Sequence, residues 1–223
     1  MTTQEVTISV DEARRVSGLL QAPQAARVCY VLAHGAGAGM SHPFMAAVAS
    51  GLAERGIATL RNQFPYIEQG SKRPDAPKLA QATVRAAVTA ACGLVPKLAL
   101  VAGGKSFGGR MTSQAQASSP LPEVRGLAFL GFPLHPAGRP SSERANHLFE
   151  VKVPMLFLQG TRDVLANTAL LQDCIQRLGT RATLKLFQDA DHSFRVSART
   201  GRRDSDVRSD MLDTLTYWIE TVA

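Results

Sequence analysis

Residues 98–109 read LALVAGGKSFGG, and this stretch indicates the class of fold that the chain adopts. Its first part, Leu98–Ala102, is a short apolar run, which is typical of a strand buried inside a sheet. Phe107–Ala117 follows with a pattern that favours a helix. Residues 104–108 match G-x-S-x-G, in which the serine occupies a sharp turn between a strand and a helix. The pattern therefore predicts that Ser106 presents its hydroxyl group at such a turn.

Two other interpretations fit a glycine-rich turn with a serine. An ordinary connection between a strand and a helix also uses glycine, and phosphate-binding loops contain Gly-Lys-Ser. This chain, however, lacks the first glycine of the phosphate-binding pattern G-x-x-x-x-G-K-[ST]. The predicted strand and helix favour the nucleophile turn, because small residues on either side of Ser106 accommodate its strained backbone. The amide groups at the start of the following helix would also favour negative charge at this place.

A serine hydroxyl becomes a nucleophile at neutral pH only when a base removes its proton. In folds with this turn, the partners follow the serine in the order Asp or Glu, then His. The last predicted strand, Thr183–Phe187, is followed by a loop that contains His192. The other four histidines either precede Ser106 or fall in the irregular stretch before the predicted strand Pro154–Leu158. We therefore expect His192 to be the base.

The predicted acid is Asp163, which follows the strand Pro154–Leu158 and lies between the serine and the histidine in the chain. Its role would be to hold the imidazole tautomer and to stabilise the imidazolium. An aspartate at this place could equally be the N-cap of a predicted helix, Leu165–Leu178. Asp189 and Asp191 are rival acids, but they lie too close in sequence to the histidine to come from the neighbouring strand.

The oxyanion of a tetrahedral intermediate needs two preorganised N–H donors. One is expected to be the backbone amide of Phe107, directly after the serine. The other should come from the glycine-rich segment His34–Met40, which follows the buried apolar run Val28–Ala33. Within this segment the amide of Ala36 is the best placed, whereas His34 is expected to brace the loop through hydrogen bonds.

The rest of the chain alternates predicted strands with predicted helices. This order predicts a mostly parallel sheet with helices on both faces, and the 223 residues fit one domain, 1–223. Active sites in such sheets lie beyond the carboxyl ends of the strands, where the residues above are found. Residues 62–77 and most of 131–153 are expected to be irregular. Further strands are expected at Val6–Val10, Val16–Leu20, Gly126–Leu130 and from Ile57 to Leu60, and further helices from Pro43 to about Arg55 with Ser41 as N-cap, at Lys78–Cys92 and at Asp204–Thr221.

Charge and composition argue against several classes of partner. The formal net charge is +7, but the positive residues are interspersed with acidic ones and lack interleaved aromatic residues, so we expect a solvated basic surface and no nucleic acid. No apolar run approaches the roughly 20 residues that span a bilayer, and residues 1–15 lack the pattern of a signal peptide. The three cysteines are widely spaced and predicted to be reduced. These features predict a cytoplasmic protein without membrane contact.

The sequence resembles the α/β-hydrolase superfamily over essentially its whole length. Several motifs resemble a group of small hydrolases related to dienelactone hydrolases, which includes bacterial predicted hydrolases, testis-expressed homologues and a hydrolase-like domain of a histone-acetyltransferase regulatory subunit. These motifs are HGAGAGM at 34–40, GGKSFGGRM at 103–111, GFPLHPAGRP at 131–140, QGTRD at 159–163 and DADHSF at 189–194.

The resemblance implies an α/β-hydrolase fold without a full cap domain, and a catalytic triad of Ser106, Asp163 and His192. It also implies oxyanion amides from Ala36 and Phe107, and neither a metal nor an organic cofactor. Dienelactone hydrolases proper use a cysteine nucleophile, whereas this chain has a serine. Their lactone substrate is therefore not carried over.

We expect a serine hydrolase that acts on small-molecule carboxylic esters or related acyl substrates through an acyl-enzyme. An acyltransferase or a perhydrolase would use the same triad, and a non-catalytic interaction module with a hydrolase-like fold is a further alternative. Lys105 and Arg110 flank the serine turn and would favour acidic substrates unless they face solvent or pair with acids. Apolar walls of an open, shallow site are expected from four residues that could equally serve in packing: Phe64, Tyr66, Phe132 and Leu134.

Overall fold

In the computed structural model, which describes residues 3–223, the side chains of the central strand β3 (Val28–Ala33) alternate between two hydrophobic cores. Cys29 and Val31 pack in one core, and Tyr30 and Leu32 pack in the other. Burial on both faces is typical of a strand in a sheet covered by helices on each side. The continuous apolar sequence of β3 is thus explained by its place at the centre of the molecule.

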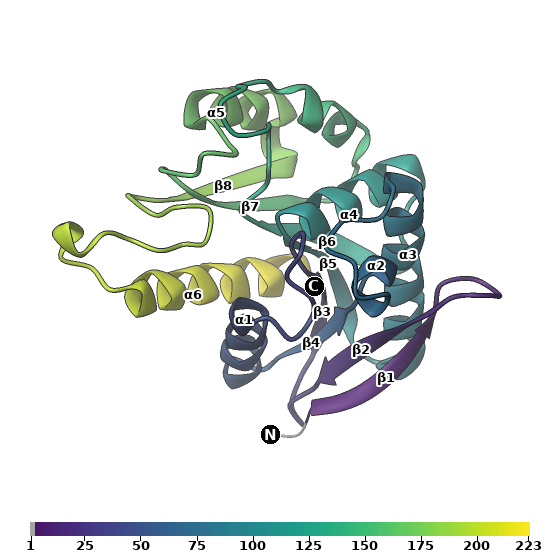
Figure 1. The fold of residues 1–223 in the computed structure, drawn as a ribbon. Coiled ribbons are helices and arrows are strands. Elements are labelled where there is room, and N and C mark those ends of the chain that lie inside the picture. The colour runs from purple at the N-terminus through teal and green to yellow at the C-terminus, as the bar shows by residue number, and fades with distance from the viewer. Residues whose placement is uncertain (1–2) are drawn as a thin grey trace.

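Within residues 3–223 the sheet has eight strands in the order β1-β2-β4-β3-β5-β6-β7-β8 (Figure 1). The pairs β1–β2 and β2–β4 are antiparallel, and all other neighbours are parallel. The prediction of a mostly parallel sheet is therefore confirmed. The bounds of the other strands are Thr3–Ser9 (β1), Arg15–Gln21 (β2), Ile57–Asn62 (β4), Ala99–Lys105 (β5), Val124–Leu130 (β6), Met155–Gly160 (β7) and Ala182–Phe187 (β8).

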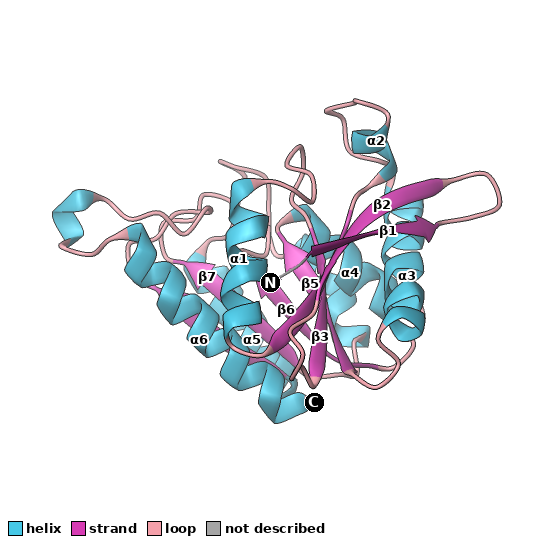
Figure 2. Ribbon diagram, turned by 90° about the horizontal axis from the view of Figure 1, so that it is seen from below, coloured by secondary structure: helices cyan, strands magenta, loops and turns pink. Residues whose placement is uncertain are grey.

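Helices cover both faces of the sheet, as Figures 1 and 2 show. Helices α1 (Pro43–Glu54) and α6 (Asp204–Val222) pack on one face, where their apolar side chains meet Tyr30 and Leu32. The other face is covered by three helices, α3 (Pro77–Leu94), α4 (Phe107–Ser118) and α5 (Thr168–Leu178). None of the helices within the described residues is both long enough and apolar enough to cross a membrane.

Two predicted helix starts are wrong. The N-cap of α1 is His42 and not Ser41, because the Nδ1 atom of His42 accepts a hydrogen bond from the amide of Phe44. Helix α5 begins at Thr168 and not at residue 165. Its N-cap is Asn167, whose side chain accepts a hydrogen bond from a backbone amide one turn into the helix. Leu165 and Ala166 continue the apolar pattern of α5 although they precede its N-cap, so the pattern alone places the start too early.

Both segments expected to be irregular contain short helices. Residues 62–77 include α2 (Pro65–Glu68), and 131–153 include the 3₁₀ helix η1 (Glu143–Glu150). The hydroxyl group of Ser113 on α4 lies 2.8 Å from Nε2 of His147 on η1. This contact fastens the connection between β6 and β7 to the helix that follows the serine turn.

Candidate active site

Ser106 lies at the carboxyl end of β5 with a backbone conformation that is unusual for a residue other than glycine. Its φ is 50° and its ψ is −113°, and α4 begins at the next residue. The strand continues to Lys105, three residues further than its predicted end at Ala102, so the chain turns sharply at the serine itself. Ser106 is partly exposed, and its hydroxyl group makes no hydrogen bond to any of the residues 3–223.

The glycines around this serine are required by close approaches of the backbone. A Cβ atom on Gly104 or on Gly108 would overlap the carbonyl oxygen of Ala33 at the end of β3. A Cβ atom on Gly103 would overlap the carbonyl oxygen of Ala128 in β6. The G-x-S-x-G pattern thus reflects the tight packing of the turn between two neighbouring strands.

The structure joins the predicted base to the predicted acid. Nδ1 of His192 lies 2.6 Å from Oδ2 of Asp163. Because a carboxylate only accepts hydrogen bonds, Nδ1 carries the proton and Nε2 is left unprotonated in the neutral ring. Asp163 also accepts hydrogen bonds from the side chain of Gln159 at 2.5 Å and from the amide of Leu165 at 2.8 Å. Its side chain is completely buried, whereas that of His192 is 24% exposed.

The other interpretations of these acidic residues do not fit the structure. Asp163 is not the N-cap of α5, because Asn167 holds that position. Asp191 accepts hydrogen bonds from two backbone amides of its own loop, those of Ser193 and Arg195. Asp189 accepts a hydrogen bond from the side chain of Gln188.

Gly131 marks the place where the histidine approaches the serine turn. A Cβ atom on Gly131 would lie 3.4 Å from Cε1 and Nδ1 of His192, and 2.9 Å from Nζ of Lys105. The amide of Ser106 in turn donates a hydrogen bond to the carbonyl of Leu130 at 3.2 Å. The imidazole ring therefore lies over the end of β6, next to the serine turn.

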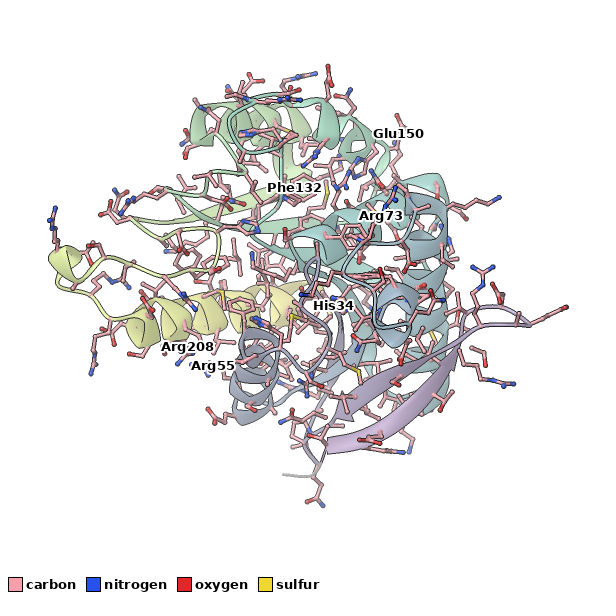
Figure 3. All side chains as sticks on the ribbon, viewed as in Figure 1. His34, Arg55, Arg73, Phe132, Glu150 and Arg208 are labelled. Atoms are coloured by element: carbon pink, nitrogen blue, oxygen red, sulfur yellow. The ribbon has the colours of Figure 1, made fainter. Side chains whose placement is uncertain are left out.

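Hydrogen bonds with buried side chains hold the glycine-rich loop after β3, as predicted for His34. The ring of His34, labelled in Figure 3, is buried, and burial lowers its pKa to about 4, so it is neutral. Its Nδ1 lies 2.7 Å from the carbonyl of Gly35, and its Nε2 accepts a hydrogen bond from the amide of Phe64. Tyr66 adds a second brace, because its hydroxyl group accepts a hydrogen bond from the amide of Gly37 at 2.8 Å.

The two predicted oxyanion donors are both available. The amide of Ala36 has no acceptor within residues 3–223. Phe107 is the first residue of α4, where a backbone amide has no partner inside the helix. A Cβ atom on Gly35 would lie 3.8 Å from that of Ser106, so the loop and the serine turn are in contact.

The four predicted wall residues are packing residues in this structure. Phe64, Phe132 and Leu134 are fully buried, and Tyr66 is 2% exposed. The ring of Phe64 packs edge-on against that of Phe107, with 5.3 Å between ring centres. This contact supports the residue directly after Ser106. Sequence alone could not distinguish these roles, because an apolar residue in a loop beside a site serves either purpose.

Lys105 and Arg110 differ in their surroundings. The side chain of Lys105 turns inward, and its Nζ donates a hydrogen bond to the backbone carbonyl of His192 at 2.6 Å. Arg110 is half-buried, and its Nε atom is buried without an acceptor within the described part of the chain. Arg144 on η1 lies close enough to lower the pKa of Arg110, in addition to the larger effect of burial.

Within residues 3–223, no group of three or more His, Cys, Asp or Glu side chains could hold a metal ion. The fold and this arrangement define a hydrolase-type α/β protein whose site lies at the carboxyl ends of the parallel strands. The chain belongs to the alpha/beta hydrolase domain family, which matches residues 26–220.

Solved structures confirm the fold. Dienelactone hydrolase from Anabaena variabilis ATCC 29413 is 22% identical, with 99% of this chain and 98% of that chain covered and a TM-score of 0.80. XC6422 from Xanthomonas campestris, described as an α/β serine hydrolase without lid, is 21% identical over 97% and 94% of the two chains, with a TM-score of 0.75. The esterase domain of a Rhodothermus marinus protein is 18% identical over 98% of each chain, with a TM-score of 0.74.

Proposed function

We propose that this α/β hydrolase is a serine esterase that cleaves small carboxylic esters or related acyl substrates. The proposal is carried above all by the pairing of His192 with the buried carboxylate of Asp163, at the same edge of the sheet as Ser106. That pairing leaves Nε2 of His192 available as a base, which is the atom that must remove the serine proton. The positive φ of Ser106 and its partial exposure also support the proposal, because a nucleophile at such a turn presents its hydroxyl group to a substrate.

The reaction would proceed in two stages. Ser106 attacks the acyl carbonyl while Nε2 of His192 takes the serine proton, and the amides of Ala36 and Phe107 bind the oxyanion. The protonated imidazole then gives its proton to the leaving alcohol, and the acyl-enzyme forms. Water attacks this ester in the second stage, again with His192 as base, and releases the acid. Asp163 stabilises the imidazolium in both stages.

In the resting structure the serine and the histidine are not yet joined by a hydrogen bond. Catalytic hydrogen bonds are often long in the free protein and tighten when substrate binds, so this geometry is compatible with the proposed mechanism. The connection between β6 and β7 contains only η1 within the described residues, which supports a site without a full cap domain. Such a site suits small or flexible acyl groups.

The decisive experiment is labelling by a fluorophosphonate probe, which reacts with activated serines. We expect the wild-type protein and Ser119→Ala, which lacks an exposed serine after α4, to be labelled equally. Ser106→Ala should not be labelled. Product analysis of the unlabelled wild-type protein with p-nitrophenyl esters, in water and then with added alcohol or peroxide, separates hydrolysis from acyl transfer and perhydrolysis. A folded wild-type protein that resists the probe would contradict the proposal and favour a non-catalytic module.

A further inference from the structure

The lysine directly before the candidate nucleophile is buried inside the molecule. Lys105 is 9% exposed, although it is the last residue of β5 and lies at the edge of the site. Its Nζ donates a hydrogen bond of 2.6 Å to the backbone carbonyl of His192. The side chain is therefore unavailable as a contact for acidic substrates, and it connects the two segments that carry the serine and the histidine.

Two aromatic rings enclose the ammonium group. Nζ lies 5.9 Å from the ring centre of Phe44 and 5.8 Å from that of Phe194, and these two rings stack on each other. Both distances are within the range of cation–π attraction. Asp163 and Asp191 are the acids that act on this ammonium through space, but neither forms an ion pair with it within residues 3–223.

We propose that Lys105 is a positioning residue, which fixes the main chain of His192 and thereby sets the place of the imidazole relative to Ser106. This inference rests on the proposed function. His192 is held at two points: its ring by Asp163 and its backbone carbonyl by Lys105, each at 2.6 Å. The contact with Asp163 determines the imidazole tautomer, and the contact with Lys105 fixes the position of the loop that carries His192.

The topology explains why such a contact is needed. His192 follows β8, and β6 and β7 separate β8 from β5 in the sheet. The loop must therefore reach across the ends of two strands to bring the imidazole to the serine. Gly131, at the end of β6, leaves the space for this path, because a side chain there would meet both Nζ of Lys105 and the ring of His192.

Stability does not account for a lysine at this position. Burial lowers the pKa of Lys105 to about 8, which means that the folded protein disfavours the charged form despite the nearby acids. An unbranched apolar residue such as methionine would fill the same space without that cost. A buried lysine whose charged form the folded protein disfavours, and which contacts the backbone of His192, is best explained by its effect on catalysis.

The test compares Lys105→Met with Lys97→Met, which removes an exposed lysine before β5. For a neutral substrate such as p-nitrophenyl acetate, we expect kcat of Lys105→Met to fall at least tenfold with KM changed less than twofold. The rate of fluorophosphonate labelling should fall in the same proportion. The melting temperature should stay the same or rise, which a merely structural role would not produce. Lys97→Met should match the wild-type protein in all four measurements.

The pH profile gives a second, independent readout. In the wild-type protein kcat should decline above about pH 8, as the ammonium loses its proton and its bond to the carbonyl weakens. Lys105→Arg keeps a charged donor at this pH and should retain part of the activity without that decline.

Wild-type kcat in a folded Lys105→Met variant would overturn the positioning role. A selective rise of KM for esters with an acidic acyl chain would overturn it too, because it would make Lys105 a substrate contact. Both results differ from failure of the proposed function. In that case the wild-type protein itself would not be labelled at Ser106. In that event the positioning role fails together with it.

Discussion

Oδ2 of Asp163 is shared between Nδ1 of His192, at 2.6 Å, and the side-chain amide of Gln159, at 2.5 Å. The hydrogen bond from Gln159 holds the carboxylate independently of the histidine. Because both carboxylate oxygens are occupied, the acid has one orientation in which it can serve the imidazole. The base is thus positioned by a group that is itself held rigidly.

Asp163→Asn should lower kcat by about three to four orders of magnitude with little change in KM, because an amide in this place favours the wrong imidazole tautomer. Steady-state hydrolysis of a p-nitrophenyl ester measures both constants. Asp173→Asn, at an exposed position on α5, is the matched control and should behave as the wild-type protein does. Activity within tenfold of wild type in Asp163→Asn would show that the acid of this site is another residue.

Gly108→Ala should abolish activity and destabilise the fold, because the added methyl group would overlap the carbonyl of Ala33. Overpacking of this type costs about 1–3 kcal/mol or more. Gly93→Ala, near the end of α3, has open space around the new methyl group and should leave activity unchanged while adding up to about 1 kcal/mol of stability. Urea denaturation of both variants measures the difference. Equal effects of the two substitutions would contradict the close-packed serine turn.

The free energy of unfolding should rise with pH between about 8 and 10.5 because of Lys105. The unfolded chain keeps the lysine proton up to the ordinary pKa of 10.5, whereas the folded protein releases it near pH 8. The unfolded state therefore binds more protons in this window, and stability increases by roughly 3 kcal/mol across it. The measurement is denaturant unfolding at pH 7.5 and pH 10.5 for wild type and Lys105→Met. The variant should lack this increment, and an identical pH dependence of the two proteins would contradict the burial of a charged lysine.

Arg110 should favour substrates that carry a carboxylate on the acyl chain. Arg110 is half-buried, and its Nε atom has no protein acceptor within residues 3–223. It lies on the first turn of α4, one helical turn after Ser106. For Arg110→Met, we expect the ratio of kcat/KM between a succinate half-ester and the corresponding butyrate ester to fall about tenfold. Arg208→Met, which removes an exposed arginine on α6, should not change that ratio. An unchanged ratio in both variants would leave Arg110 with no part in substrate choice.

The elements that carry Ser106 and Asp163 were predictable because β5 and β7 are buried, apolar strands and each of these residues follows one. β8, which precedes His192, is only partly buried, and its position as the last strand in the chain is what placed the histidine. The chain order Ser106, Asp163, His192 predicts that the aspartate and the histidine are partners. The structure joins these two residues at 2.6 Å. The glycines of the serine turn were predictable for the same reason, since the motif has a steric cause that is local to the turn.

The internal role of Lys105 was not predictable, because its partner lies 87 positions away in sequence and is a backbone carbonyl. The same holds for Tyr66, whose hydroxyl group braces the amide of Gly37. In the sequence both residues stand beside a site and resemble substrate contacts. Only the path of the chain in space shows that they support other parts of the protein.

The short connection between β6 and β7, fastened to α4 through Ser113 and His147, has a consequence for how the enzyme meets its substrate. Under the proposed function, we therefore expect no opening step at an oil–water boundary before an ester reaches Ser106. Turnover should follow the concentration of dissolved ester in a simple hyperbola and show no jump when droplets form. A jump in rate when droplets form would instead show that a segment has to move before the ester reaches Ser106.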